Sequence, residues 1–149
     1  MSYATGEDAV LLLRLLVAAA LAAVVGWERE TAGKSAGLRT HMLVGLAAAL
    51  YTGLGVLGME RAGADPGLRA DPVRVIQAVA LGIGFLGGGA IAAARSEGHP
   101  GGLTTAASIW TTAATGIAAG IGHYVLAAGA TLLQFVVLRV LARFDRSAG

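Results

Sequence analysis

The residues whose types could do chemistry begin with two carboxylates at the end of the first apolar stretch. Glu28 and Glu30 stand two positions apart in a short polar run. Mg²⁺ usually takes one or two carboxylates and keeps several waters, so this pair could offer oxygens to such a hard cation. Arg29, Lys34 and Arg39 compete for the same carboxylates. The alternative, which we favour, is an ion-pair network that holds the connection together.

Hydroxyl side chains recur at helical spacing between residues 103 and 120. At about 100° per residue they project within about a third of the helix circumference, and Trp110 points the opposite way. This hydroxyl stripe consists of Thr104, Thr105, Ser108, Thr111, Thr112 and Thr115. Because hydroxyls that face lipid lose hydrogen bonds, the stripe should face the bundle interior or a wet cavity. Bonds to carbonyls and neighbouring helices are one interpretation, and a hydrated path for an ion is the other.

Asp71, Pro72 and Arg74 mark the start of a helix. Asp71 has the residue type of an N-cap, and Pro72 suits the first helical position. Arg74 falls in the first turn, where the helix dipole disfavours a cation. We therefore expect a carboxylate partner for Arg74, with Asp71 three residues earlier as the nearest candidate.

No catalytic centre is expected. The histidines at 41, 99 and 123 fall in different connections or helix ends, so no pair has metal-ligand spacing within one segment. No positioned base accompanies the hydroxyls, and the chain contains no cysteine. The run from Gly82 to Gly87 matches GxGxxG but lacks the preceding strand and the later acidic residue of a dinucleotide site. We predict neither an enzyme nor a resident cofactor.

The elements that position these residues are long apolar stretches. The chain has 56% hydrophobic and 13% charged residues, where a soluble domain carries roughly 25% charged. A transmembrane helix needs about 20 mostly apolar residues. We predict an all-α membrane helix bundle, one domain over residues 1–149, that spans the bilayer about five times, at 9–27, 41–58, 73–94, 103–120 and 121–141. A tight hairpin around Gly120 and Gly122 should separate the last two helices.

Small residues recur at every fourth position within several of these stretches. Helix packing in lipid gains little from hydrophobicity, so close backbone approach at small residues supplies contact instead. We expect such packing at Gly45, Gly53, Gly84, Gly88, Gly116 and Gly120.

Basic residues in the short connections predict the orientation. With the N-terminus outside, seven of them fall on the cytoplasmic side and three outside, so we predict an N-terminus outside and a C-terminus inside. Arg14 lies within the first stretch, where its stem can snorkel toward the outer surface. The basic residues are dispersed rather than gathered on one face, which argues against nucleic acid as a partner.

Five short runs are specific as a set. They are Gly26–Glu30, Gly37–His41, Asp71–Val75, Gly82–Gly87 and Gly102–Trp110. In order and spacing they resemble the MgtC/SapB family of bacterial inner-membrane proteins over nearly the whole chain. The resemblance implies a five-helix membrane domain with its N-terminus outside. Many members add a cytosolic C-terminal domain, which we do not find in this sequence. By matching positions, the resemblance implies functional residues at Glu28, Arg39, Asp71, Arg74, Thr104, Thr105, Ser108 and Trp110.

The resemblance also implies a link to growth under magnesium limitation, as a regulator that contacts another membrane complex such as the ATP synthase. No helix centre carries an acidic residue of the kind that transporters use for coupling, which also favours a regulator. The first alternative is a small Mg²⁺ channel or carrier, a homo-oligomer and preferably a dimer, built around the hydroxyl stripe. The second alternative is a membrane scaffold subunit, with Trp110 on its lipid-facing side.

Overall fold

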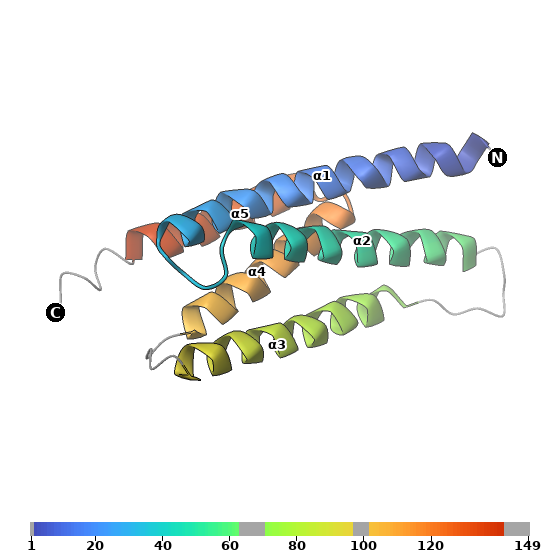
Figure 1. The fold of residues 1–149 in the computed structure, drawn as a ribbon. Coiled ribbons are helices and arrows are strands. Elements are labelled where there is room, and N and C mark those ends of the chain that lie inside the picture. The colour runs from blue at the N-terminus through green and yellow to red at the C-terminus, as the bar shows by residue number, and fades with distance from the viewer. Residues whose placement is uncertain (1, 63–70, 97–101, 142–149) are drawn as a thin grey trace.

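The fold is an all-α bundle, seen in a computed structural model that describes residues 2–62, 71–96 and 102–141. In these ranges the helices are α1 (Ser2–Thr31), α2 (Leu38–Ala62), α3 (Pro72–Ser96), α4 (Leu103–Gly120) and α5 (Tyr124–Val136). A π-helical turn, Val137–Leu141, continues α5. In Figure 1, α2 lies between α1 and α3, and α4 passes obliquely behind α2. The prediction of an all-α chain with five helices is confirmed.

Three of the helices are long and apolar enough to cross a membrane: Gly6–Thr31, Leu38–Glu60 and Val73–Ser96. They carry many exposed large apolar side chains, as lipid-facing helices must. The sequence predicted that the other two helices, α4 and α5, span the bilayer in the same way, but both are shorter. α4 has only 18 residues and carries the hydroxyl stripe, and the apolar part of the last helix covers Tyr124–Val140. The membrane character of the bundle therefore rests on α1, α2 and α3.

The helix that carries the hydroxyl stripe, α4, is the central one. It packs against α1, α2, α3 and α5, whereas the outer helices touch fewer neighbours. Half of its residues are buried, including Thr105, Ser108, Thr112 and Thr115. The buried hydroxyls of α4 therefore lie between helices and not on the surface that faces lipid.

Glycines bring the α4 backbone against α2. A Cβ at Gly116 would overlap the carbonyl oxygen of Gly45, and a Cβ at Gly120 would lie 2.6 Å from the carbonyl oxygen of Ala49. On the other side of α2, a Cβ at Gly45 would lie 2.8 Å from the Cβ of Ala22 in α1. A Cβ at Gly53 would overlap the side chain of Leu11. α2 is thus held between α1 and α4 at distances that only glycine permits.

Gly84 and Gly88 in α3 differ from the other predicted packing glycines. Both are exposed, and a Cβ at either position would meet nothing within 4 Å among the described residues. Instead, Gly87 approaches α4, where a Cβ would lie 3.4 Å from the Cβ of Ala106. Gly84 and Gly88 share one face of α3, as the spacing of four residues predicts, but this face points away from the described part of the bundle.

The predicted hairpin between α4 and α5 is present and ends α4 in a Schellman motif. The backbone amide of His123 donates to the carbonyl of Ala118 at 2.8 Å, and that of Gly122 donates to Ala119 at 3.0 Å. Gly122 has φ +88°, a left-handed conformation that favours glycine. The hairpin returns the chain along α4, so that α5 contacts both α4 and α1.

Arg14 turns inward to the hairpin instead of snorkelling. Its Nη1 donates to the carbonyl oxygen of Gly120 at 3.0 Å, in the last turn of α4. A cation at a helix C-terminus also interacts favourably with the helix dipole. Because α1 begins at Ser2, Arg14 lies well inside the helix. Its Nη1 bonds within the protein, and its Nε is buried without a partner among the described residues.

The packing at Gly116 predicts a large effect of added side-chain volume. Gly116→Leu should destabilise the protein by about 1–3 kcal/mol, because overpacking forces α2 and α4 apart. Thermal unfolding in detergent, followed by the fluorescence of Trp27 and Trp110, measures the change. Gly129→Leu in α5 is the matched control, because a Cβ there meets nothing within 4 Å. Equal melting temperatures for the two variants would contradict the packing described here.

Candidate functional site

Buried polar side chains from three helices meet in the interior of the bundle. We call this set the polar cluster: His41 of α2, Ser108 and Thr112 of α4, and Gln134 of α5. His41 is fully buried, and the other three are at most 8% exposed. Polar groups at this depth cost free energy unless they are hydrogen-bonded, so their geometry indicates how the site is organised.

His41 bonds through both of its ring nitrogens. Nδ1 lies 2.9 Å from the carbonyl oxygen of Gly37, which can only accept, so Nδ1 carries a proton. Nε2 lies 3.1 Å from the hydroxyl oxygen of Ser108. The ring thus connects the first turn of α2 to the middle of α4.

The Ser108 hydroxyl faces two groups that can accept its single proton. It lies 2.8 Å from the carbonyl oxygen of Thr105 as well as 3.1 Å from His41 Nε2. If His41 is neutral, the hydroxyl can donate to Nε2; if His41 is protonated, Nε2 donates to the hydroxyl, which then donates to Thr105. The pair can therefore accommodate either protonation state without an unpaired group.

Gln134 completes the polar cluster from α5. Its Nε2 donates to the carbonyl oxygen of Ser108 at 2.8 Å and to the Thr112 hydroxyl at 3.2 Å. Its Oε1 is buried and has no hydrogen-bond partner among the described residues. Sequence analysis missed both Gln134 and His41. The signal for Gln134 was its position as a single amide within a long apolar stretch.

The hydroxyl stripe faces inward along most of its length. Thr105, Ser108, Thr112 and Thr115 are buried, Thr111 is half-buried, and Thr104 is exposed. Most of these hydroxyls donate to carbonyls one turn back: Ser108 to Thr105, Thr111 to Ala107, Thr112 to Ser108, and Thr115 to Thr111. Trp110 is 54% exposed, as expected for the opposite face.

The two carboxylates near the end of α1 bond to different groups. Glu28 and Arg29 form a buried ion pair, with Arg29 Nε 2.6 Å from Oε2 of Glu28 and Nη2 3.0 Å from Oε1. Glu30 Oε2 instead accepts from the backbone amide of Leu38 at 2.7 Å and so stabilises the start of α2. Across the described residues, no three His, Asp or Glu side chains are grouped to hold a metal ion.

The remaining predicted residues lie at helix ends. Asp71 Oδ1 accepts from the backbone amide of Val73 at 2.9 Å, the bond of an N-cap. Arg74 is exposed in the first turn of α3 and, within the described ranges, forms no ion pair with Asp71 or another carboxylate. Arg39 is exposed in the first turn of α2. The structure thus buries Glu28, Thr105 and Ser108 in the bundle and leaves Arg39, Asp71, Arg74, Thr104 and Trp110 exposed.

Comparison with known proteins agrees with this architecture. The family model of the MgtC family matches residues 15–147. The chain is 39% identical to "Putative magnesium transporter YhiD" of Escherichia coli K12 over 129 residues, which cover 87% of this chain and 59% of that protein. It is 37% identical to "Protein SrpB" of Synechococcus elongatus over 151 residues, 96% of this chain and 81% of that protein.

"Protein MgtC" of Salmonella typhimurium LT2 is 36% identical over 122 residues, 82% of this chain and 48% of that protein. The chain thus spans about half to three fifths of the length of YhiD and MgtC. No solved structure matches it. The family model covers nearly all of the helical bundle, so the chain belongs to the MgtC family.

Proposed function

We propose that this protein is a multi-pass protein of the bacterial inner membrane that serves adaptation to low Mg²⁺. It acts as a regulator that binds another membrane protein through helix contacts, with its N-terminus outside and its C-terminus inside. Membership of the MgtC family and the magnesium-related name of the relative YhiD support the link to magnesium. The observation that carries the regulatory role is the exposed glycine face of α3.

The glycine face of α3 consists of Gly84 and Gly88 with the neighbouring Leu81. Leu81 is 80% exposed, and a Cβ at either glycine would meet nothing within 4 Å. At about 100° per residue, these three residues lie on one side of α3. In lipid, helices associate where small residues let backbones approach. α3 packs on α2 and α4 through other residues, so this face supports contact with a helix from outside the chain.

The partner that we propose is a membrane complex such as the ATP synthase, or a second copy of the chain in a homodimer. Both would present an apolar helix within the bilayer, which is the chemistry that the glycine face favours. The buried ion pair of Glu28 with Arg29 also supports a regulator over a transporter, because this carboxylate already has its partner.

Bulky substitutions on the glycine face should abolish function without unfolding the protein. Gly84→Leu and Gly88→Leu add side chains into open space, so the melting temperature should stay within about 2 °C, as for surface substitutions. Growth in low-Mg²⁺ medium of a strain that depends on this chain should fall to that of the deletion strain.

Gly129→Leu on α5 is the matched control, because it adds the same side chain to another open glycine. It should support normal growth. Normal growth of both α3 variants would show that the glycine face is not needed for function.

A Mg²⁺ channel or carrier formed by several copies is the second candidate. Gln134 Oε1 favours it, since a buried acceptor that has no partner among the described residues can bind a cation or water. In that case Thr112→Val, Ser108→Ala and Gln134→Leu should lower Mg²⁺ flux into vesicles at least tenfold.

The regulator predicts instead that vesicles containing the wild-type protein show no flux above protein-free vesicles. A saturable Mg²⁺ flux that disappears in Glu28→Ala, in protein whose folding is intact, would replace the regulatory function with transport. Circular dichroism and the melting temperature of each variant establish that folding is intact.

A further inference from the structure

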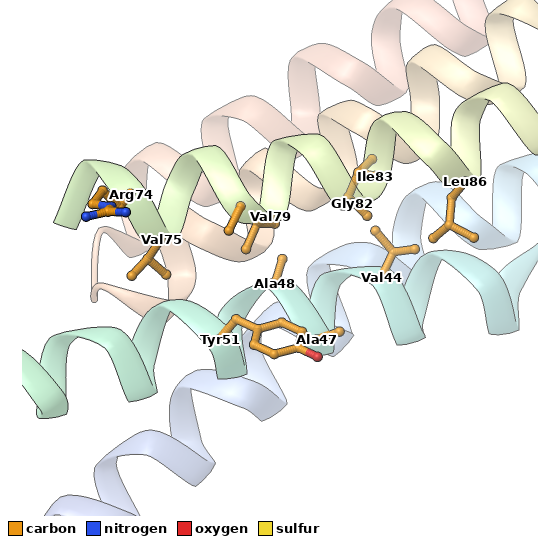
Figure 2. Close-up of a pocket in the computed structure, with 11 residues that line it drawn as sticks. Val44, Ala47, Ala48, Tyr51, Arg74, Val75, Val79, Gly82, Ile83 and Leu86 are labelled. Atoms are coloured by element: carbon orange, nitrogen blue, oxygen red, sulfur yellow. The ribbon is translucent and has the colours of Figure 1, made fainter. Parts of the chain in front are cut away.

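A hydrophobic groove with a volume of about 660 Å³ runs between α2 and α3. Figure 2 shows Val44, Ala48 and Tyr51 on the α2 side, and Val79 and Leu86 on the α3 side. Apart from Arg74 and the hydroxyl of Tyr51, all of the lining side chains are hydrocarbon or glycine. Its volume lies within the range of roughly 300–1,000 Å³ of pockets that bind small molecules.

The groove has the length of one leaflet of a bilayer. Along α3 it extends from Arg74 to Leu86, twelve positions that correspond to about 18 Å of helix. Half of the hydrocarbon core of a bilayer is about 15 Å thick. Since Val73–Ser96 is long enough to cross the membrane, Arg74 lies at one end of the span, at the depth of the headgroups.

One end of the groove carries the guanidinium of Arg74. Arg74 is exposed and has no carboxylate partner within the described residues. The N-terminus of α3 adds the positive end of its helix dipole. The nearest acidic residue along the chain, Asp71, caps the helix through the amide of Val73. This end therefore favours an anionic group, while the rest of the groove favours a hydrocarbon chain.

We propose that the groove binds one acyl chain of an anionic phospholipid, whose headgroup phosphate bonds to Arg74. The acyl chain fills the space along the groove, where α2 and α3 do not contact each other. Arg74, for which the sequence predicted a carboxylate partner, obtains an anion from the lipid instead.

Lipid binding to the full chain tests the proposal. The purified protein in detergent is titrated with dipalmitoyl phosphatidylglycerol, and native mass spectrometry measures the bound lipid. Arg74→Gln removes the cation, and Gly82→Leu fills the groove with a side chain whose Cβ meets no neighbour within 4 Å. Each should weaken binding of the first lipid at least fivefold.

Two control variants distinguish the groove from general attraction of lipid. Arg95→Gln removes an exposed cation from the other end of α3, and Gly129→Leu adds the same bulk on α5. Both should bind lipid as the wild type does. An excess of inorganic phosphate should not displace the lipid, because the acyl chain supplies most of the contact.

Three results would each overturn the proposal. The first is wild-type lipid affinity in either Arg74→Gln or Gly82→Leu. The second is an equal loss in Arg95→Gln, which would indicate attraction by charge alone. The third is a photo-cross-link from position 82 that captures a second copy of the chain, which would make the groove a protein interface.

Discussion

The bundle depends on the packing of α4 against all four of the other helices, which places its buried hydroxyls between helices. Its buried hydroxyls donate largely to its own backbone, and its Ser108 and Thr112 are also hydrogen-bonded to His41 and Gln134. These bonds form only if α2 and α5 lie close to α4 on the hydroxyl side. In the absence of water, every such group must find its partner within the protein. The positions of α2 and α5 relative to α4 are therefore coupled to the bonds of the polar cluster.

Glycine makes this enclosure geometrically feasible. Gly116 and Gly120 place the α4 backbone against Gly45 and Ala49 of α2, where a side chain would overlap a carbonyl group. The close approach increases dispersion contacts, which matter more in lipid than in water because burial of apolar surface gives little gain there. At the end of α4, the carbonyl oxygen of Gly120 accepts a hydrogen bond from Arg14, so a charged residue of α1 stabilises the hairpin.

α3 contributes no side chain to the polar cluster, and both proposals concern it. One side packs on α4 through Gly87, another forms the groove against α2, and a third exposes Gly84 and Gly88. Regulation through a partner helix and retention of a lipid are compatible, because the glycine face and the groove lie on different sides of α3.

The sequence by itself determined the helical class, the family and the ends of several helices, since these follow from local composition, caps and glycine turns. The sequence could predict the N-cap at Asp71, the turn at Gly122 and the inward direction of the hydroxyl stripe, because each depends on a single helix. Only the tertiary structure decided which groups bond across helices. Arg14 meets Gly120, His41 meets Ser108, and Gln134 meets Thr112, pairs separated by 106, 67 and 22 positions. The spacing of four residues at Gly84 and Gly88 predicts a face that another helix can approach closely. Which helix lies against that face depends on how whole helices cross.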